Sequence, residues 1–138
     1  MIDRSTEFGA RVAQRLATEQ IIWLTTVRAD GVPQPSPVWF LWDGTEMLMY
    51  SRANMPKLRN IAQNPAVALH FNSDEHGNNI VVLTGTARID EHAPPSTDVP
   101  AYIEKYRDGI ADIGMTPEAF AAAYPVAVRI TPTNVRGH

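Results

Sequence analysis

The chain has no cysteine, no long hydrophobic run and, among ten arginines, only two lysines. The absence of cysteine excludes disulfides, thiolate metal sites and cysteine nucleophiles. The densest apolar run extends from Val38 to Trp42, which is far too short to span a membrane. Residues Met1–Arg4 do not begin the apolar stretch of a signal peptide. These absences lead us to expect a cytoplasmic protein without a membrane anchor.

The composition is that of an ordinary globular domain. A net charge of −3 argues against a general nucleic-acid binder, and a hydrophobic fraction of 44% excludes a disordered chain. A chain of 138 residues is the size of one domain, and scaling predicts that about two-thirds of its surface is buried on folding. We therefore treat residues 1–138 as a single domain.

Hydrophobic periodicity predicts a mainly β fold with peripheral helices. Apolar residues recur at spacing four over residues 5–19, which indicates an N-terminal helix, and they alternate as in strands from Gln20 onwards. No regular alternation of strands and helices follows, so a small antiparallel barrel fits better than a parallel sheet. Strands are predicted at 21–28, 32–42, 46–52, 67–71, 80–89 and 126–131, and Gly85 indicates a bulge or bend within the fifth of them. A short helix is predicted at 54–63, and helical segments near 98–112 and 117–123. The last two segments form an insertion of about residues 96–123 before the final strand.

The second predicted strand carries prolines at alternate positions. Pro33, Pro35 and Pro37 remove three N–H groups from the same edge of that strand, so this edge cannot pair normally with a neighbour. Two interpretations remain open. The edge is either protected against aggregation or left free for a ligand.

The segment from Val38 to Trp42 is apolar on both faces of the same strand. A half-exposed antiparallel strand would alternate between apolar and polar residues, so both faces of this segment must be covered. A helix, a partner subunit or a flat aromatic ligand could cover the second face. We favour a homodimer interface.

The stretch from Ser51 to Arg59 contains a strand end, a turn and the start of a helix. Lys57 lies in the first turn of that helix, where a cation is unfavourable, and Arg52 and Arg59 flank it. This clustering is explained if the helix start holds an anion such as phosphate, to which Ser51 could add a hydroxyl donor. A solvated basic patch explains it equally well. Neither a P-loop nor a GxGxxG pattern is present.

Taken in order, several pieces of this sequence resemble the pyridoxamine 5′-phosphate oxidase-like split β-barrel family, and within it the small proteins that use the deazaflavin coenzyme F420. The pieces that carry the resemblance are residues 24–31, 35–40, 50–52, 57–61, 64–68 and 85–87. The match covers roughly residues 8–90 and 124–136. The resemblance implies a split antiparallel β-barrel of the FMN-binding type. It also implies a homodimer with two cofactor sites at the subunit interface.

The resemblance also assigns residues to the cofactor. It implies that Lys57, with Ser51 and Arg52, meets the cofactor phosphate, and that residues 36–39 lie beside the flat ring. The predicted cofactor-binding set is Ser36, Pro37, Val38, Trp39, Ser51, Arg52, Met55, Pro56 and Lys57. No metal site is expected. No catalytic side chain is assigned either, because water, Tyr50 or an arginine could donate a proton.

The function implied is an F420-dependent oxidoreductase that transfers a hydride between the deazaflavin and an unidentified small-molecule acceptor. FMN-using relatives carry a denser basic run after the third strand, whereas residues 53–56 interrupt it here. The deazaflavin branch commonly ends in a Trp where this chain has His138. Two alternatives are an FMN-dependent oxidase or reductase of the same fold, and a non-catalytic cofactor- or haem-binding storage protein.

Overall fold

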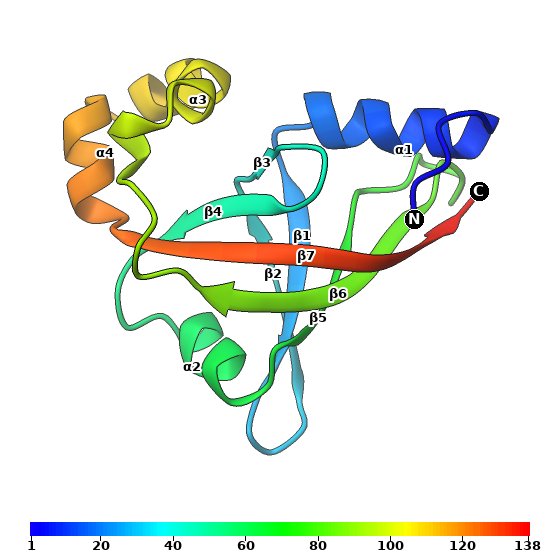
Figure 1. Cartoon of the computed structure of the whole chain (residues 1–138), viewed down its shortest axis with the longest axis horizontal. Coiled ribbons are helices and arrows are strands. Elements are labelled where there is room, and N and C mark those ends of the chain that lie inside the picture. The colour runs from blue at the N-terminus through cyan, green and yellow to red at the C-terminus, as the bar shows by residue number, and fades with distance from the viewer.

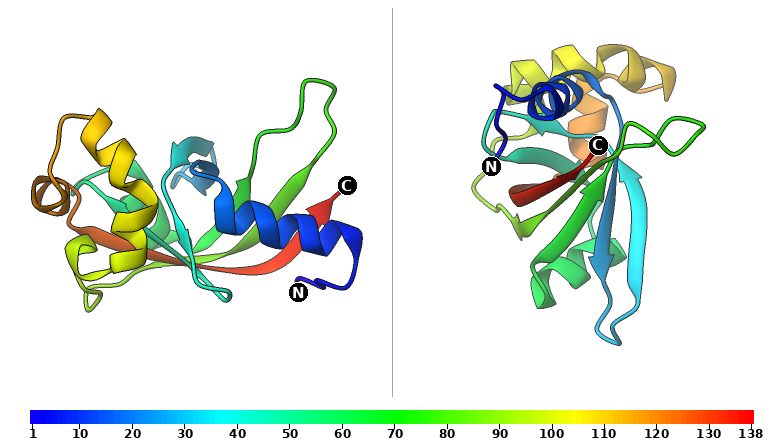
Figure 2. Two further views of the ribbon diagram at one scale, coloured as in Figure 1. Left: turned by 90° about the horizontal axis from the view of Figure 1, so that it is seen from above. Right: turned by 90° about the vertical axis from the view of Figure 1, so that its right-hand side faces the viewer.

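Seven strands form one antiparallel sheet that curls into a half-barrel, with helices packed around it (Figures 1 and 2). The computed structural model describes residues 1–138. The strands are β1 (Ile22–Val27), β2 (Pro33–Val38), β3 (Leu41–Trp42), β4 (Met47–Ser51), β5 (Ala66–His70), β6 (Val81–Ile89) and β7 (Val126–Gly137). The helices are α1 (Glu7–Thr18), α2 (Pro56–Gln63), α3 (Pro100–Asp112) and α4 (Pro117–Ala123), with a 3₁₀ turn at Ser96–Asp98. The strand order is β2-β1-β5-β6-β7-β4-β3, which confirms the predicted mainly β, split-barrel class.

The concave side of the sheet holds the larger hydrophobic core. The helix α1 begins where the Thr6 hydroxyl accepts a hydrogen bond from the N–H of Gly9, and it buries Val12 and Leu16 against the strands. The helix α2 adds Leu58 and Ile61 to the same core. None of the helices is both long and apolar enough to cross a membrane.

A second, smaller core lies between β4 and the insertion, which forms the end of the molecule at the left of Figure 1. Alternate residues of β4 enter different cores: Met49 packs in the larger core, whereas Leu48 packs in the smaller one. Trp39 and Leu41 also pack against the smaller core. Helices of the same chain therefore cover the second face of the apolar segment, and our interpretation of this face as a dimer interface was wrong. The covering residues lie far along the chain, so strand patterning could not reveal them.

The predicted strand over residues 32–42 is interrupted at Trp39 and Phe40, which is a second correction. The Phe40 N–H donates to the Tyr106 hydroxyl at 2.7 Å, and the Phe40 carbonyl oxygen lies 2.7 Å from Lys105 Nζ and 2.9 Å from the Tyr106 hydroxyl. The Tyr106 hydroxyl also lies 2.8 Å from the carbonyl oxygen of Gln20. Side chains of α3 thus replace the strand partners that Phe40 would otherwise need.

We expect Tyr106→Phe to lower the free energy of unfolding by about 1–2 kcal/mol, because the buried N–H of Phe40 loses its acceptor. Thermal or denaturant unfolding followed by circular dichroism measures this loss. Tyr124→Phe is the matched control, since the Tyr124 hydroxyl makes no hydrogen bond within the chain. Equal stability of the two variants would contradict the assigned role of Tyr106.

The strand β7 is longer than predicted and continues to Gly137 along the full length of β6. The predicted strand ended at Thr131, just before Pro132. In the structure Pro132 pairs with Gly85, where the register between β6 and β7 shifts. A Cβ atom on Gly85 would lie 2.2 Å from the Thr131 carbonyl oxygen. The bulge predicted at Gly85 is therefore confirmed, and it accommodates a proline within a long strand.

The prolines of β2 lie at an edge of the sheet, as expected. The strand β2 pairs only with β1, and Ser36 faces Leu24 across that ladder. The edge that carries Pro33, Pro35 and Pro37 has no partner within the chain. The free edge is thus a feature of the folded chain, and it ends at Pro37, beside a cavity.

Candidate functional site

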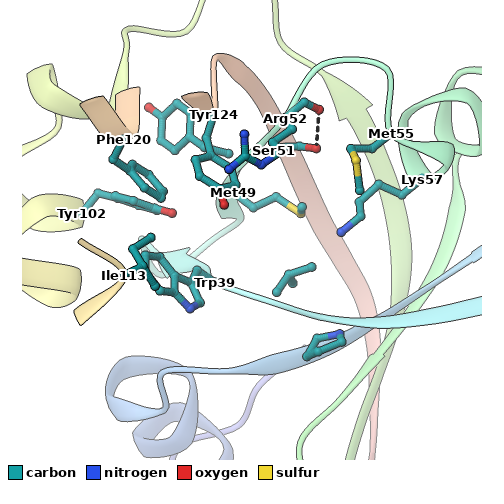
Figure 3. A pocket seen from close by; sticks show the side chains of 13 residues that line it. Trp39, Met49, Ser51, Arg52, Met55, Lys57, Tyr102, Ile113, Phe120 and Tyr124 are labelled. Atoms are coloured by element: carbon teal, nitrogen blue, oxygen red, sulfur yellow. Dashed lines mark hydrogen bonds between the residues drawn. The ribbon is translucent and has the colours of Figure 1, made fainter. Parts of the chain in front are cut away.

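A cavity of about 350 Å³ opens where the end of β2, the end of β4, the start of α2 and the insertion meet (Figure 3). Its lining is mainly apolar, with a few charged and hydroxyl groups, which is the usual character of a site for a small organic molecule. The lining residues are Pro37, Val38, Trp39, Met49, Tyr50, Ser51, Arg52, Met55, Lys57, Tyr102, Ile113, Phe120 and Tyr124.

Lys57 gives the cavity an unpaired positive charge. It is the second residue of α2, and the first turn of this helix has neither an acidic residue nor a side-chain cap. Its amine makes no ion pair, and burial alone lowers the pKa of Lys57. In Figure 3 this amine points into the cavity. A half-buried lysine beside the positive end of a helix dipole favours an anion at this position.

Ser51 and Arg52 lie beside Lys57 but already have partners. The Ser51 hydroxyl donates a hydrogen bond of 2.8 Å to the carbonyl oxygen of Arg52. The Arg52 guanidinium carbon lies 4.5 Å from the ring centroid of Tyr124, which is a cation–π contact with the insertion. Lys57 is consequently the one cation of this cluster that is free to meet an anion without breaking a contact.

Aromatic rings form the opposite end of the cavity. Trp39 stacks on Tyr106 with ring centroids 4.6 Å apart and planes 4° apart, and it stacks on Phe120 at 5.5 Å. On another side it is held by Gly109, where even a Cβ atom would lie 3.2 Å from the indole. Trp39 is therefore both a packed residue and a cavity wall.

Most of the predicted cofactor-binding residues meet in this cavity. Those that line it are Pro37, Val38, Trp39, Ser51, Arg52, Met55 and Lys57. Ser36 and Pro56 do not line it, although each is next in sequence to a residue that does. Phe40 is buried in the larger core and does not line the cavity. Arg59 lies outside the cavity and donates a hydrogen bond to the carbonyl oxygen of Asn54.

The sequence analysis missed the contribution of the insertion to the site. Tyr102, Ile113, Phe120 and Tyr124 all line the cavity, and Ile113 remains 48% exposed at a lining position. The signal that could have pointed to them is the presence of Tyr102 and Phe120 on the two helical segments predicted there. Tyr50, considered as a proton donor, gives its hydroxyl hydrogen to the carbonyl oxygen of Pro94 at 2.8 Å.

The half-barrel defines a split β-barrel protein, and the lysine-bearing aromatic cavity is its candidate site for a small organic anion. The family model described as pyridoxamine 5′-phosphate oxidase matches residues 8–138, which is nearly the whole chain. The chain belongs to this family. The comparison with curated proteins finds no match.

Solved structures of similar fold have diverse names. An F420 reductase is 25% identical, with a TM-score of 0.68, and the alignment covers 89% of this chain and 94% of that protein. A Listeria innocua protein named as a pyridoxamine 5′-phosphate oxidase is 23% identical, with a TM-score of 0.70 and coverages of 92% and 94%. The haem storage protein HutZ from Vibrio cholerae is 14% identical, with a TM-score of 0.66 and coverages of 96% and 95%.

Proposed function

We propose that this protein is a reductase that binds the deazaflavin coenzyme F420 and uses it to reduce a flat small molecule. The observation that carries the proposal is the unpaired amine of Lys57 at one end of a cavity whose other end is aromatic. A cofactor with an anionic tail matches the lysine end, and its flat ring with a flat acceptor beside it matches the apolar and aromatic remainder. The similarity to an F420 reductase supports this choice of cofactor.

The residues present fit such a cofactor in a defined way. Lys57 would hold the phosphate, aided by the start of α2, and Pro37, Val38 and Met55 would lie along the ring. The bound deazaflavin supplies the hydride chemistry itself. The chain therefore has only to bind and orient the two molecules and to exclude water, for which a mostly apolar cavity is suited.

FMN binding and haem storage are the alternatives on the same fold. Haem commonly takes a histidine as its axial ligand, and none of the four histidines of this chain lines the cavity. FMN would also place its phosphate at Lys57. The experiment must therefore compare the two flavin-type cofactors directly.

Equilibrium titrations of the purified protein with F420 and with FMN, followed by absorbance and fluorescence, test the proposal. We expect tight binding of F420, weaker binding of FMN, and oxidation of reduced F420 only after an acceptor such as menadione is added. A protein that purifies yellow with bound FMN, consumes oxygen and ignores F420 would place it in the flavin branch. Tight F420 binding without turnover of any acceptor would indicate storage.

We further propose that the working unit is a homodimer, as the family resemblance implies. The face of the sheet opposite the larger core carries half-buried Trp23 on β1 and His70 on β5, which stack at 6.2 Å and lie next to the edge strand β2. A second subunit on this surface would bury it. Light scattering at micromolar concentration should give twice the chain mass of 15.3 kDa, and Trp23→Glu should give one chain mass. A wild-type monomer under these conditions would contradict the dimer.

A further inference from the structure

Tyr102 is a fully buried residue whose hydroxyl has no hydrogen-bond partner. Its ring is held by three others: Tyr50 contacts it edge-on at 5.0 Å, Tyr106 lies at 5.0 Å and Phe120 at 6.1 Å. These contacts fix the ring, so the hydroxyl cannot swing away to find a partner elsewhere. Buried hydroxyl groups are almost always hydrogen-bonded, so this exception requires an explanation.

The neighbouring tyrosines show how unusual this hydroxyl is. The Tyr50 hydroxyl donates to the Pro94 carbonyl oxygen, and the Tyr106 hydroxyl is hydrogen-bonded to the backbone of Phe40. Only Tyr102, of the three tyrosines in this cluster, keeps its donor unused. A ligand that accepts a hydrogen bond from this buried donor is therefore favoured over a ligand of the same shape that cannot accept one.

The unused hydroxyl lies just behind the wall of the cavity, since the side chain of Tyr102 exposes no surface there. Tyr102 is one of the lining residues, and Figure 3 shows its hydroxyl directed toward the cavity, between the rings of Trp39 and Phe120. The hydroxyl of Tyr124, by contrast, points away from the cavity. Burial raises the pKa of Tyr102, so its hydroxyl stays protonated and acts as a hydrogen-bond donor at every physiological pH.

We propose that the Tyr102 hydroxyl donates a hydrogen bond to an oxygen of the acceptor molecule, which makes the cavity selective for flat molecules that carry a conjugated carbonyl or quinone oxygen. This inference rests on the proposed function, because it names the class of molecule that would be reduced. The rings of Trp39 and Phe120 bind the flat body, and the Tyr102 hydroxyl distinguishes an oxygen-bearing ring from a hydrocarbon of the same shape.

Two probe molecules with the same carbon skeleton separate the contribution of the oxygen from that of the ring. Menadione carries two conjugated carbonyl groups, and 2-methylnaphthalene carries none. We would titrate each into wild type, Tyr102→Phe and Tyr106→Phe, following the indole N–H signals by NMR. Tyr106 does not line the cavity, so wild type and Tyr106→Phe should both prefer menadione. In Tyr102→Phe this preference should fall by about tenfold, the loss expected for one buried hydrogen bond.

Thermal unfolding without ligand gives a second measurement. Since the Tyr102 hydroxyl has no partner, Tyr102→Phe should melt at or above the wild-type temperature, unlike Tyr106→Phe, which should melt lower. A lower melting temperature for Tyr102→Phe would show that a water or a protein group already holds the hydroxyl, and would overturn the proposal.

Three further results of these titrations would bear on the role of Tyr102 or on the identity of the cofactor. An unchanged preference for menadione in Tyr102→Phe, or no binding of either probe to the wild type, would overturn the role of Tyr102. Binding of F420 is measured separately on the same variants. A protein that ignores F420 but loses its preference for menadione in Tyr102→Phe would refute the proposed cofactor while leaving the recognition of oxygen intact.

Discussion

Replacement of Trp39 by alanine should lower the free energy of unfolding by about 3 kcal/mol, at the lower end of the range for removing a packed Trp side chain. The loss is expected because the indole stacks on Tyr106 and on Phe120 between the sheet and the insertion. Denaturant unfolding measures it. The same change should enlarge the aromatic end of the cavity and alter the preference among acceptors.

Trp39→Phe is the matched control, because a smaller aromatic ring keeps much of the stacking. It should cost clearly less than Trp39→Ala. The affinity for F420 should change little in either variant, since Trp39 and Lys57 lie at opposite ends of the cavity in Figure 3. An unchanged melting temperature for Trp39→Ala would show that the stacked position contributes little to folding.

Replacement of Lys57 by alanine should weaken F420 binding by about 10- to 150-fold, which corresponds to the 1.5–3 kcal/mol of a charge-assisted hydrogen bond. Lys57 is the cation of the cluster without a partner, so its whole interaction is available to the cofactor phosphate. Titration of the variant with F420 measures the effect. The fold should survive, because a lysine near the start of a helix stabilises it little.

Arg59→Ala supplies the matched control for Lys57→Ala. Arg59 carries the same charge on the same helix, but it contacts the Asn54 carbonyl oxygen and does not line the cavity. A loss restricted to Lys57→Ala would therefore reflect a specific contact with the phosphate. Equal losses in the two variants would instead indicate a diffuse effect of positive charge, which high salt should abolish.

The parts of the fold set by short-range patterns could be predicted from the sequence. The helix over residues 5–19, the bulge at Gly85 and the unpaired proline edge all follow from neighbouring residues, and all are found. The break at Phe40 could not be predicted in this way. It depends on Tyr106, which lies 66 residues further along the chain, and local periodicity carries no information about such a contact.

The candidate site likewise has a part that local sequence predicts and a part that depends on long-range packing. Ser51 to Lys57 form a strand end, a turn and a helix start, so the sequence alone brings these residues to one place. The aromatic end depends on how α3 and α4 pack across β4, which is a tertiary arrangement. Helical periodicity indicated that these helices exist, but not which side of the sheet their aromatic residues would meet.

The two ends of the cavity come from separate stretches of the chain, and this has a consequence for evolution. The cation belongs to the segment 51–57, whereas Tyr102, Ile113 and Phe120 belong to the insertion. Substitutions in the insertion can therefore change which molecules the cavity binds without altering the residues that we propose bind the cofactor. Among close relatives that act on different molecules, divergence should accumulate in residues 96–123 faster than in residues 51–57.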